Sequence, residues 1–372
     1  MASSLFPLWA LTAGLLLAGT ALPPRPATGP RLPRDGQELY RRYRGEVAGR
    51  PVVVEFTFRR LTGLPKEVQL DLTGRYYDLA TGTPHDLRPM GLFKPAAPLT
   101  LRDETDPAVA GAVWHATQPL GPVLSGTWQA RAQGPPQPFA LREDYAGAAR
   151  FELLTEQTTG RRGINAFGNP ARSSISITYL HLLGADTLRP ALARLQCPGP
   201  VRRRRERHAL DQVASAQDMA NIYDQSLDVT LNEQDLLACA TYTQEDVVDH
   251  RRAQHSWNNI VYDLRTGRQF GLLELLRPGA DTIVQRLITA QLRRGDPTYA
   301  ALLELGPGLL PLPDEDFALT PAGCQATYQT APEDEPFYAY TVTLTWAQLR
   351  PLLRPGTPLN RLLEARGLPP VR

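Results

Sequence analysis

Short runs in which apolar and polar side chains alternate follow one another through the first half of the chain. Alternation of this kind is the period of a half-buried strand. The runs lie at residues 52–58, 68–72, 74–78, 99–104, 112–116, 126–130 and 138–141. Glycine and proline separate them, and no long helical period interrupts them. The pattern predicts an all-β domain over residues 45–147, built as an antiparallel barrel or sandwich.

From residue 148 onward, strand-like runs are mixed with segments of helical spacing. The strand-like runs lie at residues 175–179, 226–231, 236–242, 258–264, 317–320, 325–328 and 340–346. Helical spacing is found at residues 185–195, 281–294 and 347–353, and residues 209–223 are either helical or irregular. In the second of these helices, Ile283, Leu287, Ile288 and Leu292 are expected on the buried face. The mixture predicts an α+β domain over residues 148–372.

The chain begins with an apolar leader. Residues 5–18 carry no charge, and small residues at 19–21 precede two prolines. A run this short is typical of a secretory signal peptide and too short for a spanning helix. We therefore predict a signal peptide over residues 1–21 and a Pro-rich linker over residues 22–44, with a short helix or turn at 36–43. The mature protein is expected to be exported to the periplasm or extracellular space, soluble and without a transmembrane segment.

Composition narrows the range of functions. A hydrophobic share of 42% and a charged share of 21% are typical of a globular protein, and a net charge of +2 predicts no strong attraction to acidic partners. Lys66 and Lys94 are the only lysines, so a mechanism based on an activated lysine has almost no candidates. Because the protein is expected to be exported, most functions that use nucleotides, nucleic acids or NAD are excluded. No cofactor is expected.

Three cysteines are too few for a disulfide-built scaffold. Cys239 and Cys324 lie in strand-like runs, where a cysteine packs as a small hydrophobic side chain. An oxidising compartment permits one bridge, and the favoured pair is Cys239 with Cys324, which leaves Cys197 as a thiol.

A set of short motifs in the second half follows the order found in a known family. The motifs lie at residues 175–179, 262–268, 283–292, 317–323 and 346–349. Together they cover most of residues 174–353, and this C-terminal half resembles the RsiV/PdaC-type extracytoplasmic domain family. That domain is shared by a lysozyme-sensing anti-sigma factor and by peptidoglycan deacetylases that carry it as an accessory domain. The resemblance implies an α+β fold and an envelope ligand, and the deacetylase catalytic domain has no counterpart in this chain.

Two loops depart from the family pattern. The family's Gly-Gly-Ala-His turn is replaced by residues 249–255, and its Pro-Tyr-Ala-x-Gly segment by residues 336–340, so glycines are lost at both places. Lysozyme binding is therefore not carried over to this chain as an identity. The candidate ligand-binding residues are His250, His255, Trp257 and Tyr338.

Other clusters admit both a functional and a structural interpretation. His250 and His255 would suit zinc, but their spacing matches no ligand motif, so a solvated loop is favoured. The arginine run at residues 202–207 is either a solvated helix start or a patch for anionic envelope polymers or a bilayer. Aromatic residues of the β domain are expected in its core, although sugar stacking is the functional alternative. These aromatic residues are Tyr76, Tyr77, Trp114, Trp128 and Phe139.

Motifs of hydrolytic enzymes are missing from the sequence. There is no Gly-x-Ser-x-Gly elbow and no His-Glu-x-x-His pair, so no serine esterase or zincin is indicated. Carboxylate clusters at residues 103–104, 143–144 and 314–316 are expected as exposed turn charges.

The sequence thus favours an exported, non-enzymatic binding protein of the cell envelope. Its partner would be a cell-wall glycan or a protein acting on one, such as a lysozyme-like enzyme, and nucleic acid is not expected. The alternatives are a hydrolase acting on envelope polysaccharide, with carboxylates brought together from separate strands, and a structural subunit of an envelope complex.

Overall fold

The structure is a computed structural model, and not every segment of the chain is described. The described residues are 32–60, 70–105, 111–130, 134–164, 168–184, 186, 192–193, 195, 197–215, 222–246, 254–294, 308–313, 317–329 and 339–369. The predicted signal peptide lies outside them, as do residues 22–31 of the predicted linker. None of the helices in the described ranges has the length and apolar character needed to cross a membrane.

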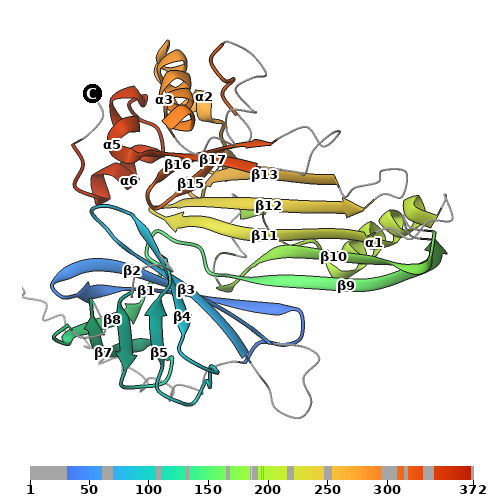
Figure 1. The fold of residues 1–372 in the computed structure, drawn as a ribbon, viewed down its shortest axis with the longest axis horizontal. Coiled ribbons are helices and arrows are strands. Elements are labelled where there is room, and N and C mark those ends of the chain that lie inside the picture. The colour runs from blue at the N-terminus through green and yellow to red at the C-terminus, as the bar shows by residue number, and fades with distance from the viewer. Residues whose placement is uncertain are drawn as a thin grey trace, which may run out of the picture.

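The first half of the chain forms an antiparallel barrel (Figure 1). Its strands are β1 (Gln37–Val47), β2 (Arg50–Arg60), β3 (Leu70–Asp78), β4 (Pro84–Pro89), β5 (Thr100–Asp103), β6 (Val113–Ala116), β7 (Val123–Gln129) and β8 (Gln137–Glu143). Each strand pairs with the next, and β1 also pairs with β8, which closes the barrel. The predicted all-β fold of this half is confirmed.

Two barrel strands differ from the sequence prediction. Residues 36–43 were expected as a short helix or turn inside the linker, but β1 already begins at Gln37. Its arginines hide the strand pattern, because Arg42 is buried although it is charged. The strand forms because β2 pairs along its whole length, a contact that local sequence does not reveal. The polar strand β4 was not expected either.

The second half contains a long sheet that continues from the barrel. Its strands are β9 (Phe151–Ile164), β10 (Pro170–Leu182), β11 (Ile222–Glu233), β12 (Leu236–Asp246), β13 (Gln254–Asp263) and β14 (Arg268–Gln269). β9 pairs with the first residues of β1, so β1 belongs to both the barrel and this second sheet. β10 and β11 are parallel, and helix α1 (Pro200–Ser215) lies in the connection between them. The helix predicted at 185–195 falls mostly outside the described residues.

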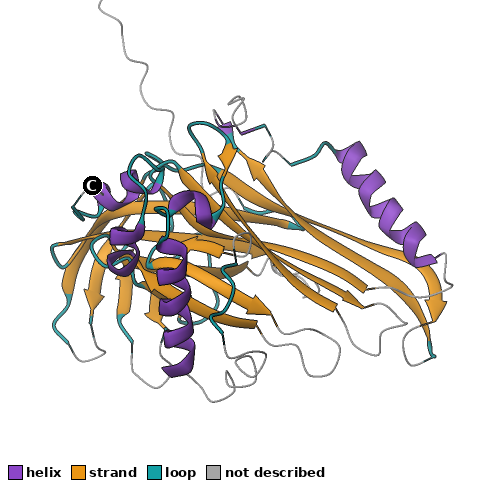
Figure 2. Cartoon of the chain, turned by 90° about the horizontal axis from the view of Figure 1, so that it is seen from above, coloured by secondary structure: helices purple, strands orange, loops and turns teal. Residues whose placement is uncertain are grey.

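A smaller layer covers one end of the second sheet. It contains β15 (Phe317–Thr320), β16 (Gly323–Gln329), β17 (Ala339–Thr345), α2 (Leu272–Leu275), α3 (Ala280–Arg294), α5 (Trp346–Leu349), a 3-10 helix (Arg350–Leu352) and α6 (Leu359–Ala365). Figures 1 and 2 show these helices at the opposite end of the sheet from α1. Together with β9–β14 and α1 they form what we call the second lobe, and its α+β class is confirmed.

Helix α3 buries Ile288 and Leu292 as the sequence predicts, but Val284 is buried in place of Ile283. Val284, Ile288 and Leu292 are buried at a spacing of four residues and pack against β15–β17. Ile283, expected on this face, is 45% exposed. It precedes Val284 by one residue, which turns it about 100° away from the stripe.

The interior of the barrel is filled by large side chains. Trp114, Trp128 and Phe139 are buried there, with Tyr76 half-buried beside them, so the prediction that they are core residues is confirmed. Tyr77 is also buried, but in a separate small cluster with Val53 and Leu79. Trp114 meets Phe139 and Tyr76 edge-on, with ring centroids 5.1 and 5.0 Å apart.

All three cysteines are free thiols, so the proposed bridge between Cys239 and Cys324 is wrong. Cys239 lies in a core beneath β9–β12, and Cys324 lies in the separate core formed with α3 and the small sheet. Each cysteine packs as a hydrophobic side chain in its own core. The second sheet lies between these two cores, which keeps the two thiols apart.

A buried ion pair joins the barrel to the second lobe. Arg366, which follows α6, donates from Nη2 to Oε2 of Glu233 at the end of β11, at 3.1 Å. The hydroxyl of Tyr77 on β3 donates to the same carboxylate oxygen, also at 3.1 Å. Burial, reinforced by the Glu233 carboxylate, raises the pKa of Tyr77 well above its usual value, which keeps the hydroxyl a donor. The barrel turn at Gly82 sits directly on Arg366 and the Pro321 carbonyl, where a Cβ would clash.

Candidate functional site

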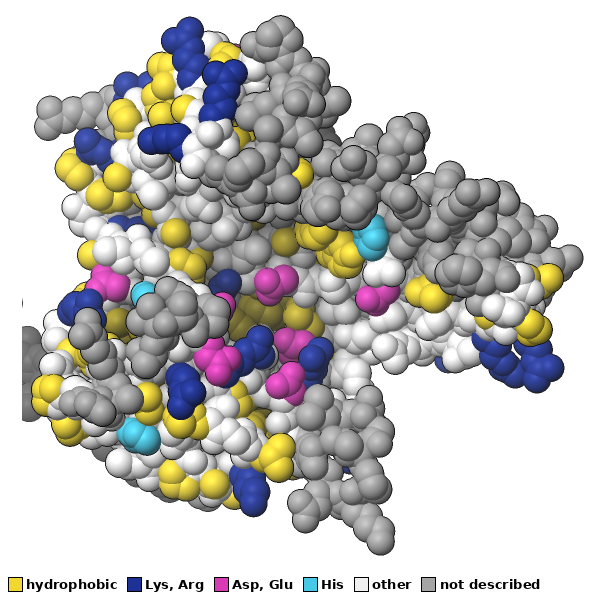
Figure 3. Space-filling view, in the orientation of Figure 1, with side chains coloured by type: hydrophobic (Ala, Val, Ile, Leu, Met, Phe, Trp, Pro, Cys, Tyr) yellow, Lys and Arg dark blue, Asp and Glu magenta, His cyan; other side chains and the backbone are white. Residues whose placement is uncertain are grey.

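A cavity of about 270 Å³ opens where the barrel meets the second sheet. Figure 3 shows a hollow at this place, with acidic and basic side chains gathered around it. The lining residues come from β1–β4, β9 and β11: Tyr40, Glu55, Phe56, Thr57, Thr73, Gly74, Arg75, Asp86, Arg88, Phe151, Leu153, Asp228 and Val229. Segments far apart in the sequence therefore build one site, which we call the junction cavity.

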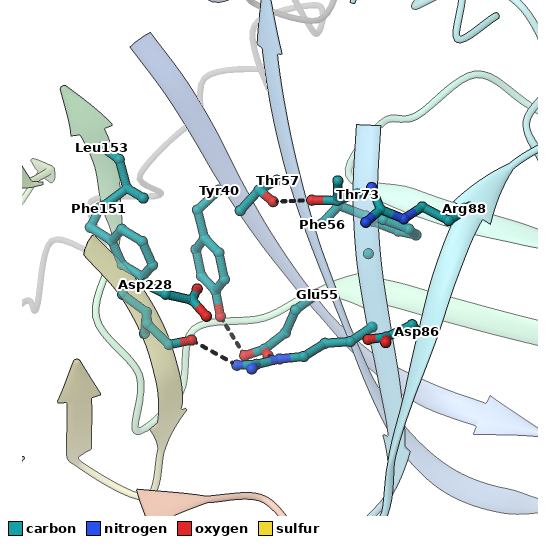
Figure 4. A pocket seen from close by; sticks show the side chains of 13 residues that line it. Tyr40, Glu55, Phe56, Thr57, Thr73, Asp86, Arg88, Phe151, Leu153 and Asp228 are labelled. Carbon is teal, nitrogen blue, oxygen red and sulfur yellow. Dashed lines mark hydrogen bonds and ion pairs between the residues drawn. The ribbon is translucent and has the colours of Figure 1, made fainter. Parts of the chain in front are cut away.

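The floor of the junction cavity is a fixed ion pair (Figure 4). Glu55 is 4% exposed and accepts hydrogen bonds on both oxygens, from the Tyr40 hydroxyl at 2.6 Å and from Arg75 Nε at 2.5 Å. Arg75 also donates from Nη2 to the Val229 carbonyl at 3.0 Å, which links the barrel to β11. Burial alone would lower the pKa of Arg75, but the Glu55 and Asp228 carboxylates outweigh it and raise that pKa.

The rim of the junction cavity is polar. Asp86 and Arg88 on β4 and Asp228 on β11 are exposed side chains that line it. On the barrel wall, the Thr57 and Thr73 hydroxyls share a hydrogen bond of 2.6 Å. Carboxylates, a guanidinium and hydroxyls together offer closely spaced acceptors and donors around one opening.

Gly74 on β3 leaves room for the Phe56 side chain in the barrel wall of the cavity. A Cβ built there would lie 2.6 Å from Cδ1 of Phe56, another lining residue. Any larger side chain at this position therefore displaces Phe56 and changes the shape of the cavity.

A strip of aromatic side chains lies on the same face of the second sheet as Asp228. Strand register places Tyr242 opposite both Ser226 and Trp257, two residues along from the Asp228–Ala240 pair. Directly opposed residues of antiparallel strands point to one face, and so do residues two apart. Asp228 and Trp257 therefore project from one side of the sheet.

The members of this aromatic strip hold one another in place. The rings of Tyr242 and Trp257 have centroids 4.5 Å apart, and Tyr242 stacks on His255 at 5.7 Å with an interplanar angle of 15°. The Tyr242 hydroxyl and His255 Nδ1 share a hydrogen bond of 2.6 Å. All three side chains are half-buried, so part of each aromatic surface is accessible.

Two of the four candidate residues from the sequence are brought together here. His255 and Trp257 share the aromatic strip, while His250 and Tyr338 lie outside the described residues. Sequence reasoning missed Tyr242, although an antiparallel pairing of the predicted strands at 236–242 and 258–264 was a usable signal. It also missed the whole junction cavity, which depends on long-range pairing.

The described residues contain no group of three or more His, Cys, Asp or Glu side chains able to hold a metal ion. His250, one of the two histidines considered for zinc, is outside that part of the chain.

The arginine run forms the first two turns of α1. Arg203 and Arg207 turn inward and pair with Glu156 on β9, the former at 2.6 Å between Nε and Oε1. Arg204 and Arg205 point outward and are exposed. The run therefore lies in a helix, and two of its arginines, Arg203 and Arg207, are held by ion pairs to the sheet.

Asp103, expected as an exposed turn charge, is instead buried. Its carboxylate accepts from the Tyr76 hydroxyl at 3.0 Å and lies 3.1 Å from Nδ1 of His85. These contacts fasten β3 and β4 to β5, so this acidic residue stabilises the barrel. The cluster at 314–316 lies outside the described residues.

No family model matches this chain, and no curated protein matches its sequence. Two solved structures are similar to it, and both are described as DUF3298 family proteins, a domain family without an assigned function. One, from Bacteroides fragilis, has a TM-score of 0.43 and 14% identity, covering 58% of this chain and 99% of that protein. The other, from Pseudomonas aeruginosa PAO1, has a TM-score of 0.42 and 16% identity, covering 57% of this chain and 96% of that protein. The narrower RsiV/PdaC-type resemblance stays a prediction.

Proposed function

We propose that the protein is an exported binding protein of the cell envelope that recognises a cell-wall glycan. One observation carries this proposal: Asp228, which lines the junction cavity from β11, projects from the same face of the second sheet as the aromatic strip on β12 and β13. A ligand that reaches from the cavity onto the strip would contact charged groups first and aromatic rings next.

The chemistry of this face suits a chain of sugar rings. A sugar presents adjacent hydroxyls that both donate and accept, and the planar carboxylates of Asp86 and Asp228 and the guanidinium of Arg88 are matched to such pairs. The apolar faces of sugar rings pack on aromatic side chains, a role available to Trp257 and Tyr242. Export, supported by the predicted leader, would place the protein where such glycans occur. The division into domains at residues 45–147 and 148–372 belongs to the same proposal.

Binding to soluble peptidoglycan fragments, measured by isothermal titration calorimetry, tests the proposal. Trp257→Ala and Asp228→Asn should each weaken binding about tenfold, which corresponds to about 1.4 kcal/mol. Tyr223→Ala is the matched control for Trp257→Ala. Like Trp257, Tyr223 is a half-buried aromatic residue, but it lies on β11 and points to the opposite face of the sheet. Asp281→Asn on α3 controls for the loss of a charge. No binding by the unmodified protein, or equal losses in the controls, would overturn the proposal.

A hydrolase is the second candidate, because three carboxylates line one cavity: Glu55, Asp86 and Asp228. Glycoside hydrolysis requires two facing carboxyl groups. Glu55 is held by Tyr40 and Arg75, which leaves Asp86 and Asp228 as the pair with accessible oxygens. Release of reducing ends from peptidoglycan that disappears in both Asp86→Asn and Asp228→Asn would favour this candidate over simple binding.

A further inference from the structure

A second groove, of about 510 Å³, lies on the other face of the second sheet. Its floor includes Leu227, Cys239 and Ile260, and strand register places these on the face opposite Asp228 and Trp257. One side is formed by Leu195, Cys197 and Arg202, the last of which lies in the first turn of α1. The volume is within the range of small-molecule sites. We call it the α1 groove.

The floor of the α1 groove changes from apolar to polar along the strands. Cys239 opposes Val229 on one side and Ile260 on the other, which makes an apolar rung. Burial raises the pKa of the Cys239 thiol to about 12, so the thiol is neutral and behaves as a hydrophobic group. The next rung along pairs Leu227 with Thr241, and Gln225 follows it. Leu227 and Ile260 are only half-buried, so apolar surface remains accessible in the groove.

An arginine stands at the edge of this floor. Arg202 lines the groove and its side chain is 76% exposed. Its ion-pair partner is Glu206, one turn along α1, at 3.0 Å, and an exposed pair of this kind contributes little to stability and yields to a competing anion. Arg204 and Arg205 are exposed on the same helix and add positive charge nearby.

We propose that the α1 groove binds an anionic amphiphile with a single acyl chain. The chain lies over Leu227, Cys239 and Ile260, and the anionic headgroup lies beside Arg202 with Thr241 and Gln225 as further hydrogen-bonding groups. Burial of the acyl chain against the half-buried floor supplies the driving force, and the arginine selects the sign of the headgroup charge. The two sites can be tested separately, because Asp228 and Trp257 project from the face of the sheet opposite Leu227, Cys239 and Ile260.

Two ligands with the same chain and opposite headgroups give the first test, on the unmodified protein. Dodecanoate and dodecyltrimethylammonium, both below their micelle concentrations, are titrated in a calorimeter. Dodecanoate should bind at least about tenfold more tightly, because its carboxylate can accept charged hydrogen bonds from Arg202, which a trimethylammonium group cannot do. Equal affinities, or no binding of dodecanoate, would overturn the proposal without the need for any variant.

Two variants then locate the ligand. Ile260→Trp should fill the groove and reduce dodecanoate affinity at least tenfold, and Arg202→Gln should reduce it about tenfold while leaving dodecyltrimethylammonium unaffected. Ile283→Trp and Arg286→Gln are the matched controls, because both residues are exposed on α3 at the other end of the sheet. Thermal unfolding confirms that each variant is folded. Undiminished binding in folded Ile260→Trp would show that the amphiphile lies elsewhere. Failure of glycan binding would leave these results unchanged.

Discussion

The barrel and the second lobe use the same kind of strand for different purposes. In the barrel, inward side chains such as Trp114 and Leu101 fill the interior, and the closing pair between β1 and β8 leaves no free edge. In the second lobe, one end of the sheet is covered by the small layer, while half-buried side chains such as Trp257 and Ile260 line its two faces farther along. The closed barrel therefore contributes mainly to stability, whereas the partly uncovered second sheet provides surfaces to which ligands can bind. Both proposed sites depend on that open sheet.

The largest effect is expected when a large side chain is removed from the barrel interior. Trp114→Ala should lower the free energy of unfolding by about 3–5 kcal/mol, because the neighbouring rings of Tyr76 and Phe139 cannot close the cavity left behind. Denaturant unfolding measures the loss. His115→Ala on the same strand is the control, since His115 is exposed and its removal should change stability by less than about 0.5 kcal/mol. A loss below about 2 kcal/mol for Trp114→Ala would contradict a rigidly packed interior.

The buried ion pair between Arg366 and Glu233, which lies where the barrel meets the second lobe, should contribute somewhat less to stability. Arg366→Met leaves the buried Glu233 carboxylate without its cation and should lower stability by about 3 kcal/mol. The double variant Glu233→Met with Arg366→Met should recover much of that loss, because removal of both charges also removes their desolvation penalty. Arg265→Met is the comparison: its ion pair with Asp235 has an arginine that is 60% exposed, so a change below about 1 kcal/mol is expected. Equal effects in Arg366→Met and Arg265→Met would show that the pair between Arg366 and Glu233 is not buried as described.

The smallest effect concerns pH. Burial in the barrel raises the pKa of Tyr43 from 10.0 to about 12, although Arg41 opposes the shift. A folded-state pKa above that of the unfolded chain means that the stability contribution is intact below pH 10 and is lost as pH rises toward 12. Tyr43→Phe should therefore make the alkaline decline shallower by about 1.4 kcal/mol per pH unit in that interval. At neutral pH it should lose only about 1 kcal/mol, from the hydrogen bond to the Gly121 carbonyl. An unchanged alkaline slope would count against burial of this hydroxyl.

Strand alternation was enough to predict most of the fold. β2 and β6 lie where the runs at 52–58 and 112–116 predict strands, although residues 52–56 are buried on both faces of β2. β1 and β4 were not predicted because pairing with neighbouring strands sets their positions, and because both contain charged residues, such as buried Arg42 and exposed Asp86. Local pattern predicts strands, and pairing between distant segments decides which polar residues belong to them.

The candidate site was harder to predict for the same reason. Trp257 and His255 were found because they are close in sequence, and Tyr242 was missed because it reaches them only through register. The junction cavity combines Glu55, Arg75 and Asp228, the last of which is separated from the others by about half the chain. No spacing rule connects such residues. Only the continuation of the barrel into the second sheet brings them together.

Strand β1 has a further consequence for attempts to study the halves of this protein separately. Its first residues pair with β9 and its last residues pair with β8, while β2 covers its whole length. Cleavage of the chain near residue 147 would leave the C-terminal fragment with the β9 backbone bare along Leu153 and Leu154, a surface that recruits other strands and promotes aggregation. A separately produced C-terminal half should therefore be expected to precipitate or self-associate until a peptide spanning Gln37–Val47 is supplied to cap it.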